Sequence, residues 1–208
     1  MENTRQRIVN AATQLFAEKG YGSTSIADLL KAADAHSGSL YHAFPTKQDV
    51  LVAVLESYRD GIVPMLLEPA WQGVDDPIDR IFALLGAYRR ALELSDCTYG
   101  CPIGSIALEL HEPDPEVRTL LADNFDGWIG HVEGCLNDAA DRLPTGLDRS
   151  RLASFILTVM EGAVMQARTQ RDLDHFDASV AMLRDYFDRL TGAVIDGTRS
   201  PNGASTTV

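Results

Sequence analysis

A run of small, hydroxylated and aromatic side chains at residues 37–42 has the chemistry needed to hydrogen-bond to phosphates and base edges. Its members on that side are Ser37, Gly38, Ser39, Tyr41 and His42. No acidic residue lies among them, so nothing there would repel a polyanion. Leu40 and Phe44, four residues apart, form the opposite, apolar side of a short helix. We therefore predict a recognition helix over residues 37–44, capped by Ser37, that enters a major groove.

The segment before this run supplies the other half of a helix-turn-helix. Ser25 and Asp28 match a capping box, which begins a helix with Ile26 and Leu29 on its apolar face. The small and polar residues at 32–36 cannot continue that face, so we place the turn there.

Two further helices flank the motif. Before it, residues 4–19 form an amphipathic pattern that ends at Gly20. After it, Thr46 and Asp49 match a second capping box, and the helix that they begin is predicted to continue to Leu67.

Together these segments resemble the N-terminal domain of the TetR family of bacterial transcriptional repressors. The matching residues, in the order and spacing of that family, are Ile8, Ala11, Ala12, Phe16, Gly20, Thr24, Ile26, Leu40, Tyr41, Phe44, Lys47 and Leu51. The resemblance implies an all-α fold. It places a helix-turn-helix DNA-binding domain at residues 1–47, the reading head, and a helical effector-binding and dimerisation domain at 48–196. The polar segment 197–208 is predicted to be a disordered tail.

The resemblance also implies which residues touch DNA. Positions that contact phosphates in the family correspond to Thr24, Ser25, Tyr41, His42, Thr46 and Lys47. Positions that read bases correspond to Ser37, Gly38 and Ser39. Helix capping alone is an alternative explanation for Thr24, Ser25 and Thr46, and partial burial is an alternative for Tyr41.

Charge is distributed unevenly along the 208 residues. The net charge is −12, yet residues 1–50 hold five basic and five acidic residues, so the excess negative charge lies beyond residue 50. A neutral head on an acidic body fits a protein that meets DNA at one end. No signal peptide and no membrane-length apolar run is present, which predicts a soluble, cytoplasmic protein with no membrane partner.

The last two predicted helices carry candidate residues for a homodimer. Apolar residues recur at alternating four- and three-residue spacings in one helix, and the helix before it has two apolar stripes. The candidates are Ile156, Val159, Ala163, Phe176, Val180, Leu183, Phe187 and Leu190. An internal core helix is the alternative; the family resemblance implies a four-helix bundle between two subunits. Two recognition helices would then lie about 34 Å apart and read a palindromic operator.

The resemblance further implies a small-molecule effector, and large apolar residues outside that seam are candidates for its pocket. They are Met65, Trp71, Phe82, Tyr88, Cys101, Phe125, Trp128, Met160 and Met165. Plain core packing is the alternative for each, and a ligand of such a pocket would be apolar and partly aromatic. The segments GCPIGSIALELHEPDPEVR and EGAVMQARTQRD resemble the LmrA/YxaF-like branch of the family, some members of which control drug efflux or respond to flavonoid-like compounds.

The remaining candidate chemistry is sparse. Cys97 and Cys101 lie in a loop where accessible thiols could sense oxidants or electrophiles, with burial as the alternative. His111, His131 and Cys135 lack metal-ligand spacing, so no metal is predicted. No phosphate loop or nucleophile elbow is present, which predicts a protein that is not an enzyme and has no cofactor. Alternative functions are a redox-responsive regulator, an activator, or a helical adaptor that ignores DNA.

Overall fold

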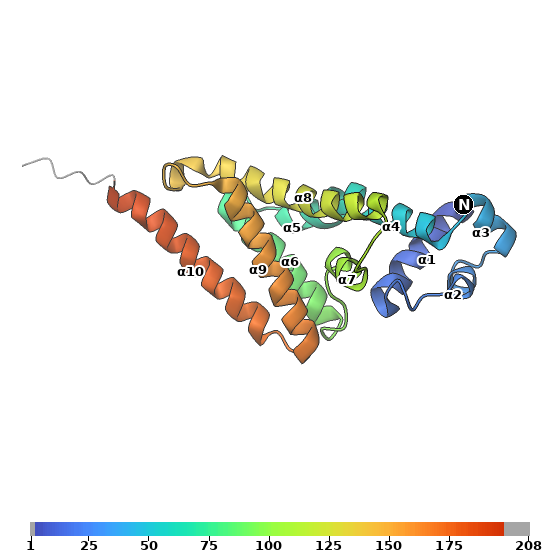
Figure 1. The fold of residues 1–208 in the computed structure, drawn as a ribbon. Coiled ribbons are helices and arrows are strands. Elements are labelled where there is room, and N and C mark those ends of the chain that lie inside the picture. The colour runs from blue at the N-terminus through green and yellow to red at the C-terminus, as the bar shows by residue number, and fades with distance from the viewer. Residues whose placement is uncertain (1–2, 198–208) are drawn as a thin grey trace, which may run out of the picture.

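The computed structural model describes residues 3–197, and every regular element in that range is a helix (Figure 1). This confirms the predicted all-α class. The first three helices, α1 (Thr4–Lys19), α2 (Ile26–Ala32) and α3 (Ser37–Ala43), form the reading head. Their shared core contains the fully buried side chains of Ile8, Leu29 and Leu40. The predicted tail lies outside the described residues, except that Gly197 ends the last helix.

Local hydrogen bonds explain where the helices of the head begin. Ser25 Oγ accepts from Asp28 N at 3.1 Å, while the Asp28 carboxylate accepts from Ser25 N at 2.9 Å. The same reciprocal pair begins α4 at Thr46, so both predicted capping boxes are confirmed. The prediction for α3 was wrong by one residue. His36 is its N-cap and makes no side-chain cap bond, whereas Ser37 is the first helical residue.

One long helical path connects the head with the rest of the protein. It consists of α4 (Lys47–Ile62), a π-helical segment (Val63–Leu67) and α5 (Glu68–Trp71). The segment from Lys47 to Leu67 is therefore helical as predicted, but it changes from α to π geometry at Val63 and leads directly into α5. Pro64 lies at the start of the π segment, and a proline has no N–H for an α-helical hydrogen bond, which accounts for the change of helix type.

The body is built from five longer elements, α6 (Pro77–Leu94), α7 (Pro102–Glu109), α8 (Pro115–Asp138), α9 (Arg149–Gln170) and α10 (Asp174–Gly197). A short 3-10 turn, Ala140–Arg142, follows α8. Asp76 and Asp114 cap α6 and α8 through their carboxylates, each with proline next, as the sequence predicted.

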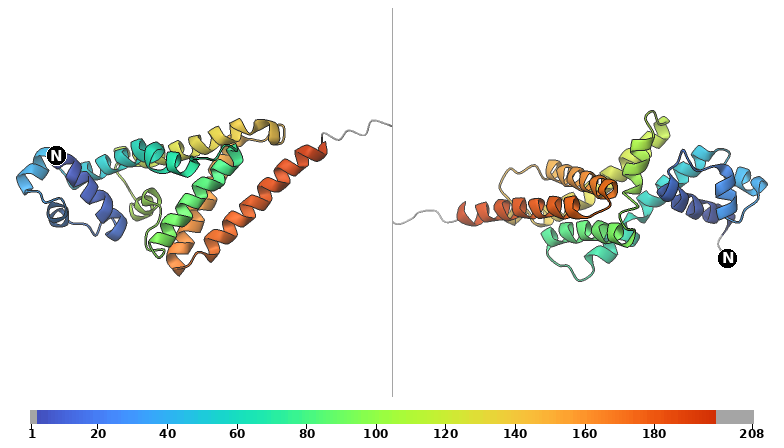
Figure 2. Two further views of the ribbon diagram at one scale, coloured as in Figure 1. Left: turned by 180° about the vertical axis from the view of Figure 1, so that it is seen from behind. Right: turned by 90° about the horizontal axis from the view of Figure 1, so that it is seen from below.

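The molecule is elongated, with the reading head at one end and the C-terminal part of α10 at the other (Figures 1 and 2). Helix α8 packs against both α4 and α9, and α10 packs against α9 and α6. Helix α7 lies on the side of the body that faces the head (Figure 1). Within residues 3–197, no helix is long and apolar enough to cross a bilayer.

Candidate functional site

The α3 helix presents a polar surface at the outer end of the head. Ser37, Gly38, Ser39, Tyr41 and His42 are all exposed. Leu40, on the opposite side of the helix, is fully buried. Tyr41 is 53% exposed, which answers the alternative of a core position. Sequence reasoning missed Arg5 of α1, whose guanidinium lies 5.0 Å from the centre of the Phe44 ring and adds a positive charge beside α3.

The predicted phosphate contacts before and after α3 divide into two groups. Ser25 and Thr46 are exposed, although their hydroxyls already serve the two capping boxes. Thr24 is fully buried, and its hydroxyl donates to the Gly20 carbonyl oxygen at 2.8 Å. This corrects the prediction for Thr24, because a hydroxyl that closes the α1–α2 turn from inside cannot reach a phosphate.

Lys47 also differs from its prediction, because its side chain points into a contact between three elements. Its ammonium donates to the Tyr21 carbonyl oxygen at 2.5 Å and lies 4.3 Å from the centre of the Tyr21 ring. The Glu109 carboxylate, at the end of α7, accepts from the backbone N–H groups of Tyr21 at 2.8 Å and Gly22 at 2.5 Å. We call these four residues the Tyr21 junction; it joins the α1–α2 turn, the start of α4 and the end of α7.

Electrostatics at the Tyr21 junction follow from this geometry. Partial burial lowers the pKa of Lys47, and the negative charge of Glu109 opposes that shift. Burial raises the pKa of Tyr21, and Glu109 adds to the increase. The carboxylate is therefore the charge that keeps the Lys47 ammonium favourable where it is partly withdrawn from water.

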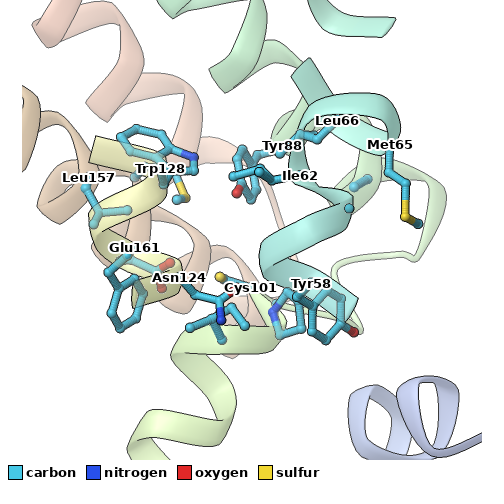
Figure 3. Close-up of a pocket in the computed structure, with 17 residues that line it drawn as sticks. Tyr58, Ile62, Met65, Leu66, Tyr88, Cys101, Asn124, Trp128, Leu157 and Glu161 are labelled. Carbon is cyan, nitrogen blue, oxygen red and sulfur yellow. The ribbon is translucent and has the colours of Figure 1, made fainter. Parts of the chain in front are cut away.

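A cavity of about 260 Å³ lies between α4, α6, α7, α8 and α9 (Figure 3). Six of the predicted pocket residues line it: Met65, Tyr88, Cys101, Phe125, Trp128 and Met160. Tyr58 and Ile62 of α4 and Met65 of the π-helical segment line the cavity on one side (Figure 3). Asn124 and Trp128 line it from α8.

Three predicted pocket residues lie elsewhere. Trp71 donates its indole N–H to the Arg80 carbonyl oxygen at 2.9 Å and lines a shallow surface hollow instead. Phe82 packs edge-on against Phe187, with ring centres 5.6 Å apart, in the core between α6 and α10. Met165 is 53% exposed and lines a more open hollow next to the cavity. These predictions were wrong because residue type does not reveal which side of a helix meets the cavity.

Sequence reasoning missed three polar residues of the cavity, namely Tyr58, Asn124 and Glu161. The Asn124 side-chain amide donates to the Leu55 carbonyl oxygen at 3.1 Å, which ties α8 to α4. Glu161 interrupts the apolar sequence LASFILTVMEGAVMQA, and that interruption was the signal that could have found it.

Comparison with known proteins follows the same division of the chain. Residues 8–54 match the model of bacterial regulatory proteins of the tetR family, and residues 77–182 match that of the LmrA/YxaF-like transcriptional regulator C-terminal domain. An HTH-type transcriptional regulator of Mycobacterium tuberculosis is 32% identical over 191 residues, covering 89% of this chain and 94% of its own. The chain belongs to the TetR family of bacterial transcriptional regulators.

Two further comparisons give a second named relative and a solved structure. The HTH-type transcriptional repressor DhaR of a Mycobacterium species is 25% identical over 175 residues, which cover 83% of this chain and 86% of DhaR. A TetR transcriptional regulator of Chloroflexus aurantiacus superimposes with a TM-score of 0.77 at 26% identity, covering 89% of this chain and 94% of its own.

The three cysteines of the TetR-family regulator are buried, which favours the burial alternative for Cys97 and Cys101 over accessible sensor thiols. Cys97 and Cys101 are 4% and 7% exposed, and Cys135 is 4% exposed. Burial is the first cause that raises the pKa of each thiol, and the nearby Glu161 carboxylate raises that of Cys101 further. A thiol with a raised pKa is a poor nucleophile, so this geometry opposes oxidant sensing.

The predicted dimer seam also needs correction. Ile156, Ala163, Phe176, Leu183 and Phe187 are almost completely buried within the subunit itself. Val180 and Leu190 are partly buried against the same core, and Val159 is half-buried. The apolar periodicity of these helices does mark buried residues, but α6, α9 and α10 of the same subunit cover most of them. Among the residues of α9 and α10 whose side chains are described, the large apolar ones that are exposed are Phe155, Met165, Met182 and Tyr186.

Proposed function

We propose that this TetR-family regulator is a homodimeric repressor that acts in the cytoplasm. It binds a palindromic operator through α3 and is released when a small apolar, partly aromatic molecule occupies the cavity. Residues 1–47 act as the reading head and 48–196 as the effector-binding and dimerisation domain, with α4 shared between them as the link.

The observation that carries this proposal is that two helices run from the cavity to the reading head. Helix α4 begins in the Tyr21 junction at Lys47 and reaches the cavity at Tyr58 and Ile62. Helix α7 begins at the cavity with Pro102 and ends in the junction at Glu109. A ligand that shifts either helix therefore acts on the same turn of the head.

Release of DNA then follows from differential affinity. A ligand that prefers the cavity shape of the DNA-free protein stabilises that state, and the operator favours the other state by linkage. The π-helical segment Val63–Leu67 contributes Met65 and Leu66 to the cavity, at the place where the path of α4 departs from regular geometry. Such segments are common at functional sites because they widen the helix locally.

The homodimer is proposed to form through an apolar stripe on α9 and α10, consisting of Phe155, Val159, Met182 and Tyr186. These residues line one shallow groove, and the rings of Phe155 and Tyr186 lie 6.4 Å apart, edge to face. A stripe on the surface can pair with its own copy around a two-fold axis, which buries apolar area from both subunits.

The test is an electrophoretic mobility shift with DNA from upstream of the protein's own gene. Wild type should give one discrete complex that competitor DNA does not remove. Gly38→Glu is the matched loss-of-binding variant, because open space surrounds Gly38 and the new carboxylate would face phosphates without disturbing the fold. Gly38→Ala, which adds no charge, serves as its control. Equal binding by Gly38→Glu and wild type would contradict the assignment of α3 as the recognition helix.

A further inference from the structure

The cavity contains a single ionisable carboxylate in an otherwise apolar and aromatic surrounding. Of its lining residues, all of which lie in the described part of the chain, only Glu161 carries a formal charge. Glu161 Oε1 is buried, and no hydrogen-bond partner reaches it within residues 3–197. A buried carboxylate oxygen without a partner is costly, so a group that completes its hydrogen bonding is expected to bind there.

The surroundings of Glu161 hold it in this position. Gly104, in the first turn of α7, lies against the carboxylate, and any Cβ at that position would overlap it. The sulfur of Cys101 lies beside the same carboxylate (Figure 3). The Glu161 side chain thus projects from α9 and packs against the start of α7, the helix that ends at the Tyr21 junction.

Among the described residues, no basic side chain forms an ion pair with Glu161. Its pKa is raised by burial, and only a hydrogen bond from Cys101 acts against that increase. The arginines of the neighbouring open hollow have other partners. Arg168 donates to Ser105 Oγ at 3.4 Å, and Arg171 donates to Thr98 Oγ1 at 2.8 Å. A cation from outside the chain would supply the ion-pair partner that these arginines do not provide.

The aromatic groups of the cavity suit a cation with an apolar body. The aromatic lining consists of Tyr58, Tyr88, Phe125 and Trp128. Aromatic faces attract cations, and methionine sulfurs tolerate varied apolar shapes. An anion would meet the Glu161 carboxylate at close range with no compensating donor of positive charge, and would be repelled.

We propose that the effector is an apolar amine whose protonated nitrogen pairs with Glu161 while its hydrocarbon or ring portion fills the space between α4 and α8. This proposal rests on the proposed function, since it names the ligand class of the same cavity. The ammonium group replaces the missing partner of Oε1. The Glu161–Gly104 contact then transmits occupancy to α7.

Three probes with one skeleton separate charge from shape, namely phenylbutylamine, phenylbutanol and phenylbutyrate. Isothermal titration calorimetry of the full-length protein measures the affinity of each. Wild type should bind the amine most tightly and the carboxylate least. Glu161→Gln should weaken amine binding by about tenfold or more, because a charge-assisted hydrogen bond is lost, and should leave the alcohol nearly unchanged. Glu116→Gln makes the same charge change on the exposed surface of α8 and should behave as wild type.

The outcomes distinguish this proposal from the function on which it rests. Wild type and Glu116→Gln should still shift upstream DNA without ligand, and a failure there counts against the proposed function. Equal or tighter binding of the alcohol, binding of the carboxylate, or no binding of the amine would overturn the cation assignment. An unchanged amine affinity in a folded Glu161→Gln protein, judged by its melting temperature, would overturn it as well.

Discussion

Removal of the Glu109 carboxylate should loosen the reading head from the body. Glu109 accepts hydrogen bonds from Tyr21 N at 2.8 Å and Gly22 N at 2.5 Å, across 88 and 87 positions of sequence. Glu109→Ala deletes both bonds but leaves the core untouched, because its side chain is exposed. The turn between α1 and α2 then loses its attachment to α7.

The size of the effect follows from those two bonds. A hydrogen bond contributes about 0.5–1.5 kcal/mol net, and one to a charged group about 1.5–3 kcal/mol. Because Glu109 is exposed, the lower range applies, and the pair together stabilises the attachment by about 2 kcal/mol. That free energy corresponds to a change of about 30-fold in the equilibrium between attached and detached turns.

Amide hydrogen exchange followed by NMR measures this equilibrium directly. Protection of the Tyr21 and Gly22 amides should fall by about 30-fold in Glu109→Ala. Glu109→Gln keeps a neutral hydrogen-bond acceptor, so protection of these two amides should fall less in this variant. Glu112→Ala removes a nearby, highly exposed carboxylate that pairs with Arg118, and the Tyr21 and Gly22 amides of this variant should exchange as in wild type.

The same contact can be broken from the opposite side. A Cβ on Gly22 would approach Glu109 Oε1 to 2.7 Å, so Gly22→Ala should displace the carboxylate without removing it. The double variant with Glu109→Ala should then lose little more protection than either single variant, because both remove one interaction. Unchanged exchange in Glu109→Ala, or fully additive effects in the double variant, would refute the link between α7 and the head.

Three further variants test other parts of the structure. Lys47→Ala should lower the free energy of unfolding by about 1–2 kcal/mol in urea titrations, since it deletes both the hydrogen bond to the Tyr21 carbonyl oxygen and the contact with the Tyr21 ring. Unchanged stability would show that Lys47 makes no stabilising contact in the Tyr21 junction. Gly104→Ala should destabilise the protein by about 1 kcal/mol or more and lower amine affinity, because it pushes Glu161 from its place; normal calorimetry and stability would contradict that contact. Met182→Glu, at a side chain 68% exposed, should yield monomers in light scattering, and an intact dimer would exclude the α9–α10 stripe as its interface.

Local patterns made much of the fold predictable. Capping boxes at Ser25 and Thr46 and the Asp-Pro starts of α6 and α8 involve residues two or three positions apart, so the sequence contains both partners side by side. Exposure of the polar side of α3 followed equally from the spacing of its apolar residues. Ser37 was misplaced by one position because any short polar residue there could have capped the helix.

Contacts between distant segments were not predictable from such patterns. From the sequence alone, Glu109 is an ordinary acidic surface residue, and its contact with the head is visible only once α7 is placed there. Glu161 is likewise one polar position in a core helix, and only the structure shows that α7 packs against it. The apolar seam at Phe187 correctly indicated burial, but periodicity does not say which helix provides the cover; here Phe82 of the same subunit does. For Cys101 the loop position left both exposure and burial open, and the structure shows it buried as the N-cap of α7.

The central claim is that occupancy of the cavity controls DNA binding by the head. Fluorescence anisotropy of a labelled duplex from the upstream region, titrated with protein and then with phenylbutylamine, tests it most directly. The complex should dissociate as the amine saturates wild type, but it should persist at the same amine concentrations in Glu161→Gln. A complex that stays intact while calorimetry shows the cavity to be filled would contradict the account.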